Sequence, residues 1–210
     1  MLFRSFGIEG YKTFAYEMLE ALGDLPAAVL FPCARGNGLY GAWKGFREAV
    51  DFGWTVRLPA MVACQPAGAN SLEASLHQGA KEAVELSPVE SVAVSTKETV
   101  SDTRALEAIH ASGGTALSAT DAEILQAVQD LGREGLCVEA SSALPVACLP
   151  RLVAEAARAT VGPIVCVLTA AGIKWPDTMA AGAPANPLVD PAPVAVDRYL
   201  ASLGLDGGGG

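Results

Sequence analysis

Apolar positions along the chain follow two different spacings in turn. In some segments they recur every three or four residues, which places them on one face of a helix. In others they form short continuous runs bounded by Pro or Gly, which are typical of buried strands. This alternation predicts an α/β fold in which helices cover a sheet. Strands are expected at 27–31, 60–64, 92–94, 115–118, 137–139 and 164–168, and helices at 9–22, 38–51, 71–85, 103–110, 120–132, 142–160 and 196–203.

The segment 31–46 combines a strand end, a loop of small residues and the start of a helix. The apolar run ends at Pro32, and Leu39 and Trp43 then begin a helical spacing. Backbone N–H groups converge at such a helix N-terminus, and the helix dipole favours an anion at the same point. Arg35 adds a full positive charge. The segment therefore predicts a phosphate-binding loop, although an ordinary strand-to-helix turn also explains a lone Gly-x-Gly.

Composition limits the classes of function. The chain has 210 residues, of which 51% are hydrophobic and 18% charged, so it is long enough for one sizeable core. A formal net charge of −9 argues against nucleic-acid binding, because the phosphate backbone requires a basic surface. No uninterrupted apolar stretch approaches the roughly 20 residues of a membrane-spanning helix, so no membrane partner is expected.

Cysteines and histidines offer little material for a metal site or a disulfide framework. The five cysteines include no Cys-x-x-Cys spacing, so we expect free thiols, mostly buried, in a reducing, cytoplasmic compartment. The two histidines, His77 and His110, lie on expected helices with no carboxylate pattern around them. A Ser-His-Asp triad or a histidine-based metal centre is therefore not expected.

Four segments, in this order, resemble the C-terminal half of threonine synthase and of related pyridoxal-phosphate (PLP) enzymes of the tryptophan synthase β type. These enzymes are known as fold type II, and the resemblance covers about residues 8–177. The segments are 9–17 (EGYKTFAYE), 32–46 with its Trp-Lys-Gly-Phe ending, the group formed by 112–116, 120–125 and 138–143, and 165–174 (VCVLTAAGIK).

The resemblance implies a three-layer αβα fold with a mostly parallel sheet, corresponding to the large-domain portion of these enzymes. It implies three parts of the chain. Residues 1–8 form an unmatched stub, and residues 9–177 form the PLP-binding portion. Residues 178–210 form a tail rich in Pro, Ala and Gly, with a short helix and a glycine end that we expect to be disordered.

The resemblance also assigns roles to individual residues. Thr169 occupies the position that offers a hydroxyl to the pyridine nitrogen of PLP, which tunes the ring as an electron sink. Glu139 is a second candidate for lining the site, or a solvated charge at a strand end. Thr115 is a candidate substrate contact, or a strand residue packed beside glycines. The cofactor phosphate would be held by the backbone of Ala34, Arg35, Gly36, Asn37 and Gly38, where Arg35 replaces a glycine of the family.

The family's Schiff-base lysine, which lies in a Ser-Phe-Lys-Asp type of context, has no counterpart in this sequence. The five lysines are expected to be exposed charges, and we therefore assign no catalytic residue. The chain would then be a truncated product, a subunit that needs an N-terminal partner or a homo-oligomer, or a decayed homologue. Exposed apolar surface and poor behaviour as an isolated monomer are expected. The lysines are Lys12, Lys44, Lys81, Lys97 and Lys174.

The function favoured by the resemblance is a PLP-dependent lyase that converts O-phosphohomoserine to threonine, with this chain alone inactive. A threonine dehydratase or a diaminopropionate ammonia-lyase is the alternative within the same class. A non-catalytic phosphate-binding α/β module is the alternative outside it. A Rossmann domain would require an acidic residue after the second strand, where Gln65 and Pro66 stand instead.

Overall fold

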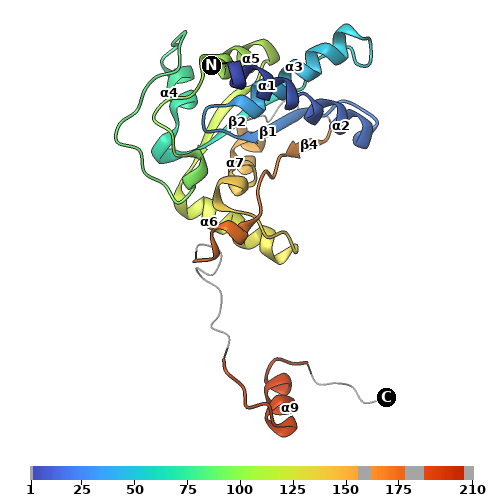
Figure 1. Cartoon of the computed structure of the whole chain (residues 1–210), viewed down its shortest axis with the longest axis vertical. Helices are drawn as coiled ribbons and strands as arrows, with labels where there is room; N and C mark the ends of the chain where they lie inside the picture. Colours follow the sequence, from blue (N-terminus) through green and yellow to red (C-terminus); the bar gives the residue numbers. More distant parts are fainter. Residues whose placement is uncertain (1, 156–161, 178–186, 206–210) are drawn as a thin grey trace. The chain divides into compact units, whose positions relative to one another are not determined.

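The computed structural model describes residues 2–155, 162–177 and 187–205 (Figure 1). The chain divides into two compact units, Met1–Met179 and Ala180–Gly210. The strands are β1 (Ala28–Pro32), β2 (Ala60–Pro66), β3 (Thr115–Ala119) and β4 (Ile164–Cys166). The α-helices of the first unit are α1 (Leu2–Gly10), α2 (Thr13–Leu22), α3 (Asn37–Asp51), α4 (Ser71–His77), α5 (Thr103–Ser112), α6 (Asp121–Arg133) and α7 (Ala140–Glu155).

The four strands form one parallel sheet in the order β3-β2-β1-β4. Alternate residues of β1 face opposite layers, as the period of a strand requires. Val29 and Phe31 pack with α2, α3 and α5, whereas Ala28 and Leu30 pack with α6 and α7. Figure 1 shows these two groups of helices on opposite faces of the sheet. The expected three-layer αβα fold with a parallel sheet is therefore confirmed.

The turn between α1 and α2 rests directly on the glycine face of α3. A Cβ atom on Gly41 would lie 2.7 Å from the Ile8 carbonyl oxygen, and one on Gly45 would lie 2.5 Å from that of Lys12. The sequence predicts a single helix over 9–22, but the structure has a turn at residues 11–12 that separates two helices. The break lets the chain follow the surface of α3, which the apolar spacing alone does not reveal.

Several other elements are shorter than their apolar pattern predicts. The expected helix 71–85 ends at His77, and the Ser75 hydroxyl then accepts a hydrogen bond from the Val84 amide at 2.9 Å. The expected strand 137–139 is reduced to a single antiparallel bridge between Val138 and Ala171. The strand expected at 92–94 is absent from the described residues, and a 3₁₀ turn occupies Val94–Thr96 instead.

Helix α7 contains two prolines inside its span, Pro145 and Pro150, and begins at Ala140, two residues before the expected start. The predicted extension of this helix to 160 lies outside the described residues beyond Glu155. In the second unit, α9 (Pro193–Ser202) begins at a proline, a residue favoured at a first helical position. The terminal glycines lie outside the described residues.

Within the described ranges, no helix is both long and apolar enough to cross a bilayer. The same residues contain no group of three His, Cys, Asp or Glu side chains arranged to hold a metal ion.

Candidate functional site

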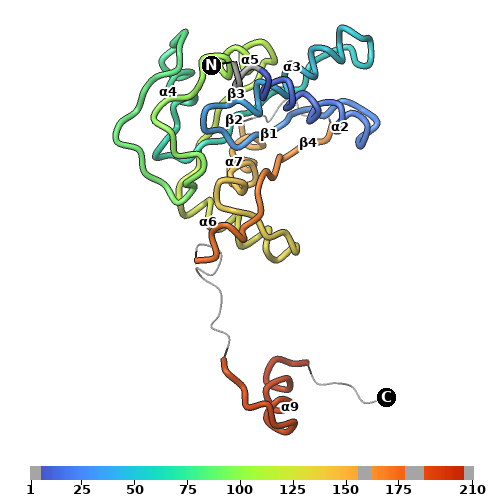
Figure 2. Tube along the Cα trace, viewed as in Figure 1, coloured from blue at the N-terminus to red at the C-terminus, as the bar shows by residue number. Residues whose placement is uncertain are grey.

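The point where the chain reverses its direction across the sheet lies between β1 and β4. From β1 the chain moves outward through β2 to β3, and it returns to place β4 on the other side of β1. Figure 2 traces β1 and β4 beside each other. Loops diverge at the carboxyl ends of such a pair, which is where open α/β sheets bind ligands. Pro32 ends β1 there, and Thr169 follows the end of β4.

A cavity of about 540 Å³ opens at this reversal point. One wall is aromatic, because the rings of Tyr11 and Phe14 are stacked and Phe14 meets Phe31 edge to face. The loop after β1 and the segment after β4 form the rest. The lining residues are Tyr11, Phe14, Phe31, Pro32, Ala34, Arg35, Gly36, Asn37, Gly38, Leu168 and Thr169. All six residues that the sequence analysis assigns to cofactor binding are thus brought together.

The carbonyl groups of the loop after β1 accept hydrogen bonds from neighbouring segments. The Ser101 hydroxyl donates to the Ala34 oxygen at 2.7 Å, and the Asp102 amide donates to the Arg35 oxygen at 2.9 Å. Gln65, almost fully buried, donates to the Cys33 oxygen at 3.3 Å. These three carbonyl oxygens are occupied by protein donors, which fixes the backbone of a loop that lines the cavity.

The amides of this loop have no competing acceptor. Among the residues that the structure describes, the backbone N–H groups of 34–38 donate to no protein oxygen, and the first helical bond of α3 runs from the Tyr40 amide to the Gly36 oxygen. Gly36 has a φ of +84°, a conformation that favours glycine. Unpaired amides at the start of a fifteen-residue helix, where the helix dipole is positive, are the donors that an anion site requires.

Arg35 adds a positive charge at the edge of this site. Its Nε atom is buried and has no hydrogen-bond partner within the described ranges. Its Nη1 atom lies 3.8 Å from a Glu98 carboxylate oxygen, which is a loose ion pair. The guanidinium therefore retains an unused donor, as an anion in the cavity would require.

Thr169 presents its hydroxyl at the other side of the cavity. The side chain is exposed, and its oxygen lies 2.9 Å from the Ser142 hydroxyl in the first turn of α7. The Ser142 oxygen also accepts hydrogen bonds from the amides of Thr169 and Ala170, at 3.2 and 2.7 Å. A buried helix thereby fixes the segment that carries Thr169.

Glu139 and Thr115 are not among the cavity's lining residues. Glu139 is only 3% exposed and faces the Lys174 ammonium at 3.3 Å, so it is a buried, paired carboxylate rather than a solvated one. Thr115 begins β3 and pairs with Val62, at the sheet edge opposite the cavity. Its position agrees with a packing role, and we do not retain it as a substrate contact.

None of the five lysines lines the cavity. Lys12 and Lys44 form ion pairs with Glu9, Lys97 pairs with Glu90 and Lys174 with Glu139. Burial raises the pKa of the nearby Cys33 thiol to about 12, so this cysteine is not a nucleophile at neutral pH. The described residues near the cavity therefore offer hydrogen-bond donors and charge, but no activated nucleophile.

Sequence reasoning missed the residues behind the site, namely Gln65, Ser101 and Ser142. In the sequence, Gln65 shows only that the acidic residue of a ribose contact is missing. In the structure, its side chain holds the loop after β1 through the Cys33 oxygen. Its Oε1 accepts the Leu72 amide at 2.8 Å, and its Nε2 donates to Ser101 at 3.1 Å. Nothing in the local spacing signals these roles, because each contact joins segments far apart in the sequence.

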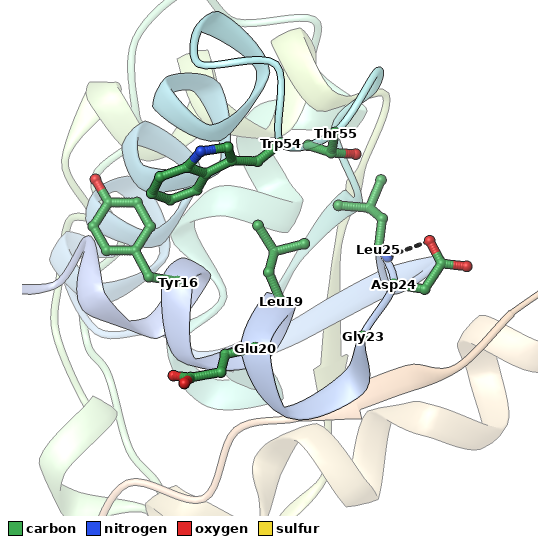
Figure 3. A pocket seen from close by; sticks show the side chains of 8 residues that line it. All are labelled: Tyr16, Leu19, Glu20, Gly23, Asp24, Leu25, Trp54 and Thr55. Carbon is green, nitrogen blue, oxygen red and sulfur yellow. Dashed lines mark hydrogen bonds between the residues drawn. The ribbon is translucent and has the colours of Figure 1, made fainter.

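A second cavity, of about 470 Å³, lies between the end of α2 and the turn after α3 (Figure 3). Tyr16 and Trp54 meet edge to face in it, with ring centroids 5.8 Å apart. Figure 3 shows the Asp24 carboxylate accepting the Leu25 amide, at 2.6 Å. Glu20 contributes another carboxylate to its lining. This cavity has negative charge and no amide cradle, so it does not suit a phosphate.

Comparison with known proteins decides the family. The sequence model described as "Pyridoxal-phosphate dependent enzyme" matches residues 2–170. The chain belongs to this family. PLP is the cofactor of the family, and the resemblance drawn from the four sequence segments is thereby confirmed.

Relatives within the PLP family include threonine synthases. That of Methanocaldococcus jannaschii is 35% identical over 176 residues, which cover 82% of this chain and 44% of that protein. That of Mycobacterium leprae is 35% identical over 199 residues, which cover 94% of this chain and 53% of that protein. The chain spans about half the length of the curated relatives it matches.

Solved structures of PLP-family members share the fold. An L-serine ammonia-lyase from Rhizomucor miehei aligns with a TM-score of 0.69 at 22% identity, over 83% of this chain and 56% of that one. A threonine deaminase from Solanum lycopersicum aligns with a TM-score of 0.68 at 21% identity, over 84% of this chain and 47% of that one. These likenesses establish the fold type II architecture.

The cavity fits PLP in the chemistry of its donors. The unpaired amides of 34–38 and the unused Nε donor of Arg35 suit a dianionic phosphate ester. The aromatic wall suits a flat ring, and Thr169 adds a hydroxyl-bearing side chain to the lining. No lysine is among the described residues that line the cavity.

Proposed function

We propose that this chain provides the cofactor-binding half of a PLP-dependent lyase of the threonine synthase type. The overall reaction would consume O-phosphohomoserine and water and release threonine and phosphate. The observation that carries the proposal is the meeting of unpaired loop amides and the Thr169 hydroxyl in one cavity. The threonine synthase relatives, at 35% identity, support this reaction over other lyase reactions.

Each residue of the cavity would have a specific task. The amides of Ala34 to Gly38 and the Arg35 guanidinium would hold the phosphate, and the tyrosine and phenylalanine rings would orient the cofactor ring and exclude water from one face. Thr169 would hold a hydrogen bond at the ring nitrogen. PLP, when bound, supplies the electron sink that makes elimination next to an amino acid's α-carbon possible.

The covalent lysine would come from the half of the relatives' length to which this chain has no counterpart. That half, or a second copy of the chain, is the partner we propose, and an amino acid is the substrate. Apolar side chains available to such a partner include Val56, 95% exposed, and Ile173, 82% exposed. Free thiols among the described residues agree with a cytoplasmic setting.

Binding of PLP to the purified chain tests the proposal. Isothermal titration should detect saturable binding that inorganic phosphate competes away, and Gly36→Ala should weaken it at least about tenfold through the distorted cradle. Gly53→Ala is the matched control, because Gly53 also has a positive φ, +74°, but lies outside the cavity. Equal affinity of the wild type and Gly36→Ala would contradict the proposal.

Two further measurements address the lysine and the reaction. Borohydride treatment of the chain with PLP, followed by peptide mass spectrometry, should find no modified lysine; a modified Lys174 would contradict the assignment of the anchor to a partner. With the N-terminal half of the Methanocaldococcus relative added, phosphate release from O-phosphohomoserine would support the threonine synthase reaction. Ammonia release from threonine instead would favour the dehydratase alternative.

A further inference from the structure

The two edge strands of the sheet, β3 and β4, are covered to different extents (Figure 2). On β3, the Ser118 amide donates to a carboxylate oxygen of Glu73 in α4 at 3.1 Å, and the Ser118 hydroxyl donates to the other oxygen. A carboxylate that occupies the amide of an edge strand blocks the approach of another strand. The β3 edge is therefore closed to a further strand at Ser118.

The β4 edge is open in the part of the chain that the structure describes. All three residues of β4 are half-buried, whereas residues 28–30, their partners on β1, are at most 1% exposed. Val165 packs against one core cluster, and Ile164 and Cys166 pack against the other. Apolar side chains on both faces are typical of an interior strand of a parallel sheet. However, β4 pairs with a described strand on one side only.

The pairing with β1 determines which backbone groups of β4 point outward. The Val167 amide, directly after β4, donates to the Leu30 oxygen at 3.0 Å. Successive residues of a strand direct their backbone groups alternately to its two sides, so Val165 also faces β1. The N–H and C=O groups of Ile164 and Cys166 therefore point away from the sheet. Groups repeated at this spacing match the backbone of another extended strand.

We infer that the outer edge of β4 pairs with the β4 edge of a second copy of the chain, in antiparallel orientation about a twofold axis. Ile164 of one copy then lies opposite Cys166 of the other, and the two residues exchange both of their outward hydrogen bonds. The same edge serves both copies, so no other chain is required. The two four-stranded sheets become one continuous sheet across the axis.

The distribution of charge agrees with pairing between identical copies. A net charge of −9 opposes self-association over most surfaces, because like charges repel. Residues 162–173 contain no charged side chain, so two copies of this edge approach without that repulsion. The inference gives a surface to the second-copy partner of the proposed function, and it does not depend on the cofactor site.

Sedimentation equilibrium of the full chain tests the inference, at about 1–100 µM. A reducing buffer prevents disulfides, since Cys166 is half-buried and Cys137 exposed. The wild type should show a monomer–dimer equilibrium. Cys166→Pro removes an outward N–H but leaves the bonds to β1, and it should raise the dimer dissociation constant at least about tenfold. Cys166→Ala keeps this N–H and should stay within about threefold of the wild type.

Amide hydrogen exchange of the wild type provides a test that does not depend on the folding of a variant. The amides of Ile164 and Cys166 should exchange more slowly as the concentration rises, whereas the Val167 amide, which bonds to β1, should be protected throughout. Equal protection of Ile164 and Cys166 at all concentrations would show that the edge is covered within one chain, and would overturn the inference.

Other outcomes would also overturn it. They are a wild type that stays monomeric to about 100 µM, and a dimer that Cys166→Pro leaves unchanged. If the chain alone is monomeric and the N-terminal half of the Methanocaldococcus relative protects the two amides, the edge belongs to that half. Binding of PLP is measured separately, so a monomer that binds PLP overturns this inference and leaves the proposed function in place.

Discussion

Gly36 approaches the helix α5 so closely that a side chain at this position would overlap Ala105. A Cβ atom placed on Gly36 would lie 2.5 Å from the Ala105 Cβ, and the φ of Gly36 is +84°. The loop that carries the unpaired amides is therefore held by two independent conditions, a left-handed backbone and a close contact. Only glycine meets both.

Gly36→Ala should lower the free energy of unfolding by about 2–4 kcal/mol, since it adds backbone strain to overpacking. Gly53→Ala has similar φ strain but no heavy atom within 4 Å of the new Cβ, so it should cost only about 1–2 kcal/mol. Urea denaturation measures both. Ala105→Gly in the Gly36→Ala background should recover part of the difference. Equal losses in the two single variants would show that the contact with Ala105 is unimportant.

Gln65→Leu should destabilise the chain by about 2–3 kcal/mol, because it leaves the Leu72 amide and the Cys33 oxygen without their partner inside the core. The affinity for pyridoxine 5′-phosphate should fall about tenfold as the loop carbonyls lose an anchor. Gln126→Leu is the control. Gln126 is exposed on α6 and bonds to Asp130, so its replacement should change stability by less than about 0.5 kcal/mol. An unchanged affinity in Gln65→Leu would show that the hydrogen bonds of Gln65 to the loop do not influence ligand binding.

Lys174→Ala should leave the buried carboxylate of Glu139 without its cation and cost about 1–2 kcal/mol at neutral pH. Glu139→Gln in the same background should restore most of this loss, because it removes the charge. Lys97→Ala breaks a pair with an exposed Glu90 and should cost less than about 0.5 kcal/mol. Thermal unfolding measures the stabilities of Lys174→Ala, of the double variant and of Lys97→Ala. If the double variant were less stable than Lys174→Ala, Glu139 would have another role.

Asp102 connects the stability of the fold at acid pH with the loop after β1. Hydrogen bonds from Arg104 hold the pKa of this carboxyl below its usual range, and the Asp102 amide bonds to the Arg35 oxygen. Because the pKa is depressed in the folded state, the carboxylate stabilises the fold above the unfolded value of about 3.9. That contribution is lost as the pH falls from about 4 through the folded pKa.

Asp102→Asn should therefore lower stability at pH 7 and flatten its decline below about pH 4. Urea denaturation across that range measures the slope. Glu85→Gln, at an exposed position, should leave the slope as in the wild type. An unchanged slope in Asp102→Asn would assign the acid sensitivity to other carboxylates.

The sequence predicts the strand end, the loop and the helix start at residues 31–38 well because their signals are local, and phosphate binding there stays a prediction. Pro32 ends a strand, and Gly36 and Gly38 mark the entry to a helix, so this turn follows from the order of residues alone. The position of Thr169 in the same cavity was available only through the resemblance to a family. No spacing in the sequence indicates that β4 pairs with β1.

The wrong predictions have a common cause. Leu72, Leu76, Ala80 and Val84 keep a helical spacing, yet the chain turns at Gly79, with a φ of +61°, and returns so that Val84 bonds to Ser75. Residues 137–139 have a strand-like pattern, but their one β-bridge in the described structure is to the segment after β4. In both places a contact beyond the range of one helical turn overrides the local preference, across nine residues in the first case and more than thirty in the second.

The pairing of β1 with β4 has a kinetic consequence. The amides and the hydroxyl that share the cavity come from opposite ends of the first compact unit, and a long loop must close before they meet. Such closure is slow compared with forming local helices. The loop after β1 and the segment after β4 therefore come to line one cavity only when the four-stranded sheet is complete.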